Sequence, residues 1–445
     1  MSGEAQLEAL LEIINTSARQ AIVEYKKDGN EVPTIHSKTY HPIDFANDTV
    51  ALKKAVRLLE GACQQLCASL APPQHTVQNY AMSFEWACIG VVIRAKVADV
   101  LEKYPKGLHV DELAKLVNLE KGKLARVLRL LATKGCFTEG KPAILLCSCF
   151  TSGDLSPTSV TSNTFANNRI SLITLSTSNP GALSRIEVED VSEGAVVLYE
   201  TMREPEYATS YDPDKSPLVY ALKKKGFKGT FFDWMKVDNY HRAMVGISDI
   251  MGSLSVLHHY PWNEVKTVCD VGASVGTVSL PLSKIYPHLK IINQDLPEVL
   301  VLSKDIWARD APEALKNNQV AFVPLNFFEE SPVQGQDVYY LRNIIHDWPD
   351  SEATVIMRSV RSAMAPHSRL LIHDYVLRSA SRDRNAKSFG ADVAPEPLLP
   401  NFGNGNNRNE RTLDESIALG SAAGLRLEKV YDLAESAVLE FRVAA

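Results

Sequence analysis

The chain has 445 residues, of which 45% are hydrophobic and 22% are charged, and its formal net charge is -6 at pH 7. A globular chain of this length exceeds one ordinary core, so we expect two or three structural units. The acidic balance argues against nucleic acid or an anionic membrane as the main partner, and no apolar run is long enough to span a membrane.

The start of the chain and its cysteines are typical of a cytoplasmic protein. Residues 1–5 show no basic stretch ahead of an apolar one, so no secretory signal is expected. The seven cysteines form neither a paired framework nor a metal-ligand spacing. We therefore predict free thiols in a reducing compartment and no metal site.

The first 180 residues are predicted to form a helical unit. Apolar residues recur at helical spacing from Leu7 to Ile22 and from Leu52 to Ala62, with Asp48 as the expected N-cap of the second helix. The run Tyr80–Leu101 is apolar nearly all round, which predicts one buried helix, packed in the chain's own core or against a second subunit. The helical unit is too thin to cover so much apolar surface, so we predict a homodimer with this unit as its main interface.

Two short segments have the spacing of a helix-turn-helix. They run from Gly107 to Leu119 and from Lys123 to Leu131, ahead of Phe137 and an expected β-wing. The basic residues of the second helix are Lys121, Lys123, Arg126 and Arg129. The motif suits either recognition of DNA or a scaffold for dimerisation, and the acidic net charge favours the scaffold.

The middle of the chain is weakly patterned. Residues 140–164 are rich in Ser and Thr and lack periodicity, which predicts a disordered loop inserted in the wing. Residues 181–260 are predicted to hold a linker at 204–215 and then helices, the last from Asn239 to Leu257. The aromatic residues before that helix are more typical of a core than of a pocket; they are Phe227, Phe231, Phe232 and Trp234.

The most informative pattern in the sequence is a strand that ends in glycines. The β-branched run Val265–Val271 breaks into the turn Gly272–Gly276, and an apolar, helix-like run, Thr277–Ile285, follows. This profile is typical of a buried parallel strand, a tight turn and a crossover helix, where glycines let a ligand approach the backbone. The next strand ends in Asp295, where an α/β nucleotide fold places the acid that binds a ribose. The pair predicts a cofactor that contains adenosine.

Two departures from the dinucleotide fingerprint indicate which cofactor binds. Ser274 stands where a pyrophosphate-binding turn needs a glycine. Asp270, two residues ahead of Gly272, would repel a phosphate but suits an ammonium or sulfonium group. The pattern therefore favours S-adenosylmethionine over NAD.

A second chemical centre follows the apolar strand that starts at Asp337. The strand runs into a polar turn that contains His346, and a helix follows at 351–363. In a doubly wound fold, ligands bind outside the carboxyl ends of the strands, and a histidine there can accept a proton near neutral pH. The next strand ends in Asp374, a carboxylate able to orient the imidazole. A helix-capping or structural histidine is the alternative.

Four motifs, in this order, resemble those of one enzyme family: Asp270-Val271-Gly272, Asp295-Leu296-Pro297, Asn343 to Trp348, and Asn409 to Thr412. The chain resembles the fungal S-adenosylmethionine-dependent O-methyltransferases that are related to the plant caffeic acid methyltransferases and include the sterigmatocystin methyltransferase type. The resemblance implies an α/β fold, with a Rossmann-like class I methyltransferase domain at 261–445. A helical, winged-helix-like dimerisation domain at 1–180 is implied ahead of it.

The resemblance also implies roles for individual residues. His346 matches the general base that removes the hydroxyl proton of the acceptor, and Asp374 and Glu410 match the two acids that flank this base. With the glycine motif, the candidate cofactor-binding residues are Asp270, Gly272, Gly276, Asp295, Leu296, Asn326, Phe327 and Arg342. A phenol is a poor nucleophile until a base takes its proton, so such a protein mainly aligns the hydroxyl with the activated methyl group.

The leading hypothesis is a cytoplasmic, homodimeric O-methyltransferase that acts on a hydroxyl of a small aromatic secondary metabolite, a phenol or a polyketide. Residues 401–408 run almost directly into Glu410, where the family has a helix that helps to wall the acceptor pocket. A relative that binds the cofactor but catalyses a pericyclic or other non-transfer reaction is therefore one alternative. A DNA-binding regulator that uses the helix-turn-helix is another.

Overall fold

The computed structural model describes residues 2–140, 163–210, 212–234, 240–377 and 410–444. Its largest element is a seven-stranded sheet with the order β11-β12-β8-β7-β4-β5-β6. Strands β4 to β8 are parallel, whereas β12 runs antiparallel to both β8 and β11. The strands are β4 (Thr267–Val271), β5 (Lys290–Asp295), β6 (Val320–Pro324), β7 (Val338–Arg342), β8 (Arg369–Asp374), β11 (Leu425–Asp432) and β12 (Ala437–Val443).

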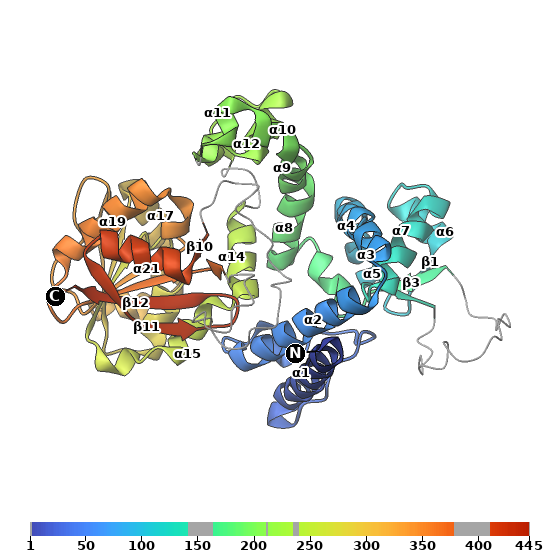
Figure 1. The fold of residues 1–445 in the computed structure, drawn as a ribbon, viewed down its shortest axis with the longest axis horizontal. Coiled ribbons are helices and arrows are strands. Elements are labelled where there is room, and N and C mark those ends of the chain that lie inside the picture. The colour runs from blue at the N-terminus through green and yellow to red at the C-terminus, as the bar shows by residue number, and fades with distance from the viewer. Residues whose placement is uncertain (1, 141–162, 211, 235–239, 378–409, 445) are drawn as a thin grey trace.

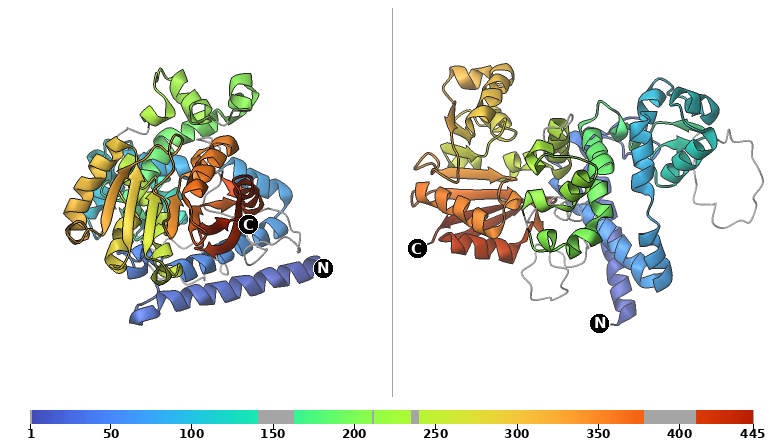
Figure 2. Two further views of the ribbon diagram at one scale, coloured as in Figure 1. Left: turned by 90° about the vertical axis from the view of Figure 1, so that its left-hand side faces the viewer. Right: turned by 90° about the horizontal axis from the view of Figure 1, so that it is seen from above.

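Helices cover both faces of this sheet (Figures 1 and 2). On one face Val268 shares a core with Trp307, and on the other Cys269 shares a core with Leu419. Residues 268–271 are consequently all buried, as expected for a parallel strand covered on both sides. The helices are α15 (Val256–His259), α16 (Ser279–Ile285), α17 (Pro297–Asp310) and α18 (Pro312–Lys316) on the first face, and α19 (Asp350–Ala363) and α21 (Leu413–Ala422) on the second. The predicted α/β fold with a Rossmann-like sheet is confirmed.

The N-terminal part is helical, as predicted. Its elements are α1 (Gly3–Tyr25), α2 (Val50–Leu70), α3 (Pro73–Ala81), α4 (Glu85–Arg94), α5 (Val97–Glu102), α6 (Val110–Leu116) and α7 (Lys121–Thr133). A small antiparallel sheet flanks the helix pair α6–α7: β1 (Leu108–His109) precedes α6, whereas β2 (Thr138–Glu139) and β3 (Thr164–Ala166) follow α7, so strands are present where the wing was expected. Helix α2 begins at Val50 with Thr49, and not Asp48, at the N-cap, although the Asp48 carboxyl accepts a hydrogen bond from the backbone N–H of Val50 at 3.4 Å.

The prediction of one buried helix over Tyr80–Leu101 is wrong. Helix α3 ends at Ala81, and Lys96 adopts a left-handed backbone (φ 51°) between α4 and α5. Apolar periodicity does not reveal a break of this kind, because the residue that makes it is not a glycine. The second half of the run is buried, but Tyr80 and Met82 are 71% and 62% exposed.

A set of helices lies between the N-terminal helices and the sheet (Figure 1). They are α8 (Asn179–Ile186), α9 (Ser192–Val196), α10 (Leu198–Arg203), α11 (Pro205–Ala208), α12 (Pro217–Lys224), α13 (Phe231–Trp234) and α14 (Tyr240–Met251). Phe231 and Trp234 are buried in one cluster with Phe227, which confirms the core interpretation for these three aromatics. The predicted helix at 239–257 is in fact two, α14 and α15, because Gly252 between them has a left-handed backbone.

Some expectations fall outside the described residues. They concern most of the 140–164 insertion and the segment that precedes Glu410. Within the ranges given above, none of the helices combines the length and the apolar character that crossing a membrane requires.

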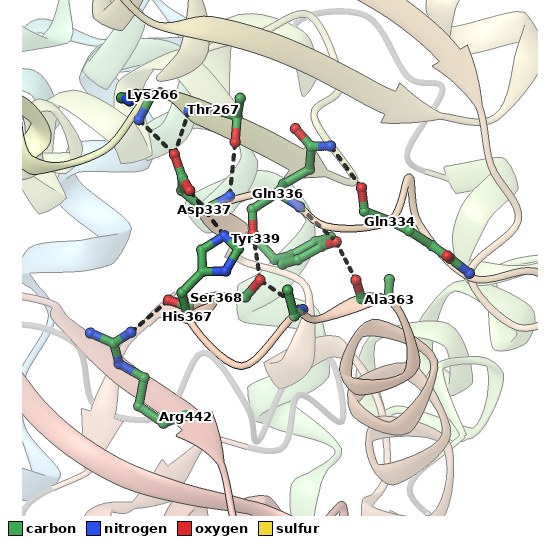
Figure 3. Close-up of polar contacts among 11 residues, drawn as sticks. Lys266, Thr267, Gln334, Gln336, Asp337, Tyr339, Ala363, His367, Ser368 and Arg442 are labelled. Atoms are coloured by element: carbon green, nitrogen blue, oxygen red, sulfur yellow. Dashed lines mark hydrogen bonds and ion pairs between the residues drawn. The ribbon is translucent and has the colours of Figure 1, made fainter.

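The amino-terminal edge of the sheet is tied together by a polar network (Figure 3). The Asp337 carboxylate accepts hydrogen bonds from the backbone N–H groups of Lys266 and Thr267 at 2.7 and 3.0 Å, so it joins the starts of β7 and β4. The Ser368 hydroxyl donates to the carbonyl of Gln336 at 2.6 Å and joins the start of β8 to the same point. This edge is the one opposite to the carboxyl ends of the strands.

We predict that Asp337→Ala lowers the free energy of unfolding by about 1–3 kcal/mol, because the exposed N–H of Lys266 and the partly buried N–H of Thr267 lose a charged acceptor. Urea denaturation of the two proteins measures this difference. The exposed carboxylate Asp305 offers a matched control, and Asp305→Ala is expected to change stability little. Equal losses in the two variants would contradict the role assigned to Asp337.

Candidate active site

A cavity of about 550 Å³ opens at the carboxyl ends of β4 and β7. Its floor and sides come from these strand ends, the glycine turn and α14. The lining residues are Tyr240, Met244, Val245, Ile247, Ser248, Asp270, Gly272, Ala273, Ser274, Val275, Thr277, Val278, Tyr340, Arg342, Asn343, Ile344 and Asp347. The cavity therefore lies where a doubly wound sheet binds its ligand.

The glycine turn is tightly enclosed, with left-handed backbone at Gly272 (φ 74°), Ser274 (φ 50°) and Gly276 (φ 84°). A Cβ on Gly276 would lie 2.5 Å from the indole nitrogen of Trp307. The turn can therefore follow this path only with glycine at position 276, whereas Ser274 is held in its left-handed conformation by a hydrogen bond from its N–H to the Asp295 carboxylate at 2.7 Å.

Two opposite charges lie at the base of the cavity. Asp270 is buried, and burial raises its pKa to about 6 against the opposing effects of the Ser279 hydroxyl and the Arg342 guanidinium. The Arg342 guanidinium donates to the Ser248 hydroxyl of α14, with the shorter distance 3.1 Å. A buried acid beside a glycine turn fits a cationic adenosine cofactor better than a pyrophosphate, as the sequence predicted.

The predicted cofactor residues are not all at the cavity. Asp270, Gly272 and Arg342 line it directly, and Asp295 is joined to its lining through Ser274. The others lie outside this lining set; they are Gly276, Leu296, Asn326 and Phe327. Leu296 is largely exposed, and the Asn326 side chain is used within its own turn, where it accepts from the N–H of Phe328 at 3.2 Å.

Three carboxylates surround one buried imidazole. Nδ1 of His346 lies 2.9 Å from Oε1 of Glu410, and Nε2 lies 3.6 Å from Oδ1 of Asp347. Nε2 is buried and has no hydrogen-bond partner among the described residues. Burial lowers the pKa of His346, but the negative charges of Asp347, Glu410 and Asp374 outweigh this effect and raise the pKa to about 9.

Asp374 completes this cluster from the end of β8. Its carboxylate accepts a hydrogen bond from the backbone N–H of Asn343 at 2.9 Å, and burial raises its pKa to about 6. The structure thus brings together His346, Asp374 and Glu410, the three residues that the sequence singled out for catalysis.

Glu410 reaches His346 because its neighbour Arg411 is anchored. The buried Arg411 guanidinium donates to the carbonyl oxygens of Ile345 and Trp348 at 3.0 and 2.8 Å, on either side of the turn that carries His346. It also binds the Asp350 carboxylate at the start of α19. The short strands β9 (Val376–Leu377) and β10 (Arg411–Thr412) pair in parallel and bring Glu410 to the end of β8.

Sequence reasoning missed a buried chain behind the cavity and one acid beside it. The hydroxyl of Tyr340 lies 2.6 Å from Nδ1 of His373, whose Nε2 lies 2.8 Å from the Ser436 hydroxyl. Burial and the Arg342 charge lower the pKa of His373 to about 3, so this imidazole is neutral. Asp347 was in the quoted motif, but its access to the cavity follows only from the fold. Over the described residues, no group of three acidic, His or Cys side chains could hold a metal ion.

Comparison with known proteins shows which family the chain matches. Residues 224–425 match the model of the O-methyltransferase domain. Over 98% of its length the chain is 35% identical to 3-O-methyltransferase 2 of Phanerochaete chrysosporium, covering 97% of that protein. It is 26% identical to 4-O-methyltransferase 1 of the same fungus, over 96% of this chain and 94% of the relative.

Solved structures show the same fold at lower identity. Human N-acetylserotonin methyltransferase in complex with S-adenosylmethionine superposes with a TM-score of 0.62 at 18% identity, over 85% of this chain and 99% of that one. The complex of LepI with S-adenosylmethionine gives a TM-score of 0.62 at 20% identity, over 88% of this chain and 94% of that one. One further match, with a TM-score of 0.61 at 20% identity over 88% of this chain and 94% of the other, is titled a pericyclic reaction enzyme.

Proposed function

We propose that this chain methylates a hydroxyl of a small aromatic metabolite, with His346 as the general base. The chain belongs to the O-methyltransferase family and is an S-adenosylmethionine-dependent enzyme. The observation that carries the proposal is the buried Nε2 of His346, which has no described partner while Nδ1 is held by Glu410. An imidazole fixed at one nitrogen presents the other to a substrate hydroxyl. The free thiols of the described cysteines suit a cytoplasmic enzyme.

In this proposal one group of residues binds the cofactor and another transfers the proton. The cofactor supplies a methyl group on a sulfonium, and Asp270, the glycine turn and Asp295 hold it at the strand ends. His346 takes the hydroxyl proton on Nε2 as the new bond to oxygen forms, and Glu410 stabilises the imidazolium through Nδ1. Asp374 adds a second negative charge and fixes the Asn343 turn. The protein thus supplies alignment and proton transfer.

Incubation with methyl-labelled S-adenosylmethionine and a panel of phenols tests the proposal. We expect the label to appear on an oxygen of at least one phenol, and the names of the two Phanerochaete relatives direct the panel to ring hydroxyls at positions 3 and 4. Conversion of an added metabolite without transfer of the label would instead support the pericyclic alternative.

The proposed base predicts a rising pH profile. The pKa of His346 is raised to about 9, so the neutral, proton-accepting form increases as the pH rises toward that value. We expect kcat/KM to rise about tenfold per pH unit below the pKa and to level off above it. Initial rates between pH 6 and 10 measure the profile. Glu410→Gln removes one of the charges that raise the pKa, so its bend should lie at lower pH, and a flat profile for the wild type would contradict the assignment.

We also propose a homodimer, formed through the apolar surface of α3 and α4. Large side chains there are more than 45% exposed: Val77, Tyr80, Met82, Phe84 and Trp86. Exposed apolar groups at this density are typical of an interface. Light scattering at micromolar concentration should give twice the chain mass of 49.1 kDa. The double variant Tyr80→Glu, Met82→Glu should give the single mass with reduced activity, and a wild-type protein of single mass would refute the dimer.

A further inference from the structure

Asp347 is the one residue of the base cluster that also lines the cofactor cavity. It ends the short 3-10 turn Ile345–Asp347, next in sequence to the base. Its Oδ1 lies 3.6 Å from Nε2 of His346, and its side chain is 42% exposed whereas that of His346 is 7% exposed. One carboxylate therefore faces both the buried base and the space that receives the cofactor.

The charges around His346 are strongly unbalanced. Its own turn contributes Asp347, the end of β8 contributes Asp374, and the residue before β10 contributes Glu410. Among the described residues of the packed elements, the cation Arg411 is bound to Asp350 and to backbone carbonyls. A second described cation at this sheet edge, Arg342 of β7, binds Ser248.

This imbalance opposes the proposed chemistry in the free protein. Three carboxylates favour the imidazolium, but only the neutral imidazole can accept the hydroxyl proton. Another positive charge close to these carboxylates would offset their effect, and the cavity that Asp347 lines is the place for it.

We propose that Asp347 couples the charge of the bound cofactor to the protonation of His346, so that binding of S-adenosylmethionine releases a proton from the base. The coupling rests on the proposed role of His346. S-adenosylmethionine carries a carboxylate, a sulfonium and an ammonium and has a net charge of +1 while the ammonium is protonated, whereas S-adenosylhomocysteine has lost the sulfonium charge. When the positively charged cofactor lies close to the Asp347 carboxylate, that carboxylate stabilises the His346 imidazolium less.

The charge balance closes over the reaction. The bond from sulfur to the methyl carbon breaks and its electron pair stays on sulfur, while a bond forms from that carbon to the acceptor oxygen. The hydroxyl proton moves to Nε2 of His346. One positive charge thus disappears at sulfur as another appears on the imidazole, and Asp347 faces one cation before and after transfer.

Calorimetry tests the coupling without turnover, because it measures the number of protons released when the cofactor binds in the absence of an acceptor. Binding heats of S-adenosylmethionine and of S-adenosylhomocysteine are measured at pH 8.5 in two buffers that differ in ionisation enthalpy. A unit charge about 10 Å away at an effective dielectric of about 20 lowers a pKa by about 1. From a starting value of about 9 this releases about half a proton per S-adenosylmethionine bound. We expect almost no release with S-adenosylhomocysteine.

Reciprocity gives a second readout from the same titrations. If binding of the cation expels a proton, a rise in pH must favour the cation. The ratio of the Kd of S-adenosylhomocysteine to that of S-adenosylmethionine should therefore increase about tenfold between pH 7 and 10. Asp347→Asn should reduce both effects, whereas Asp305→Asn, an exposed carboxylate of α17, should leave both unchanged.

The wild-type comparison decides the inference even if Asp347→Asn does not fold. Equal proton release with the two ligands overturns the coupling, and the labelled-methyl assay then shows separately whether transfer itself occurs. Unequal release that persists in Asp347→Asn overturns the part assigned to Asp347. Failure to bind S-adenosylmethionine would overturn both the coupling and the proposed function.

Discussion

Replacement of His346 by alanine is expected to lower kcat by about 10²- to 10⁴-fold, because the acceptor hydroxyl then has no positioned base. Two of the neighbouring acids are held elsewhere: Glu410 faces Nδ1, and Asp374 is bound to the Asn343 backbone. Single-turnover methyl transfer to a phenol found in the labelling screen measures the loss. The affinity for S-adenosylmethionine should change much less than kcat, because His346 does not line the cofactor cavity.

His288 offers a matched control for this substitution. It is an exposed histidine between α16 and β5, and His288→Ala should retain full activity. The assay pH is kept below the pKa of the phenol, because an ionised phenol needs no base. Methyl transfer by His346→Ala at the wild-type rate under this condition would refute the assigned base.

Substitution of Gly276 by alanine is expected to weaken cofactor binding by about 10- to 100-fold. The new Cβ would lie 2.5 Å from the indole nitrogen of Trp307, a rigid ring buried in the core, so the backbone of the turn has to move. Backbone strain of this kind costs about 1–3 kcal/mol, and 1.4 kcal/mol corresponds to about tenfold in Kd. Isothermal titration with S-adenosylhomocysteine measures the change.

Gly335 offers a control that distinguishes two effects of Gly276→Ala, the clash of the new Cβ and the loss of a glycine with left-handed backbone. It has a similar φ of 74°, but a Cβ there would meet nothing within 4 Å, and it lies at the opposite edge of the sheet. Gly335→Ala should therefore reduce stability slightly and leave the Kd unchanged. Equal Kd values for the wild type and Gly276→Ala would show that the cofactor does not depend on the path of this turn.

The sheet and its active edge were predictable because the signals are local. Strands β5, β7 and β8 each end in a charged residue, β4 carries Asp270 next to its end, and parallel strands bring those ends to one edge. Asp270 and His346 could therefore be placed at the same edge before the structure was seen. The helix breaks at Lys96 and Gly252 were missed, because one left-handed residue interrupts the backbone without disturbing the apolar pattern.

Contacts between distant segments could not be predicted in this way. The sequence places Glu410 64 residues after His346, and only the family resemblance connected them. The approach of Asp347 to both the base and the cavity depends on the direction of a 3-10 turn, which no spacing in the sequence reports. Asn326 and Phe327 were assigned by resemblance alone, and they lie outside the set of residues that line the cavity.

The anchoring of Arg411 determines where Glu410 lies relative to His346. Two sets of contacts hold Glu410 in place: the hydrogen bonds of the Arg411 guanidinium and the pairing of β9 with β10. The residues that make these contacts lie before residue 378 or after residue 409. A change in the length of the stretch between them should therefore leave Glu410 beside His346.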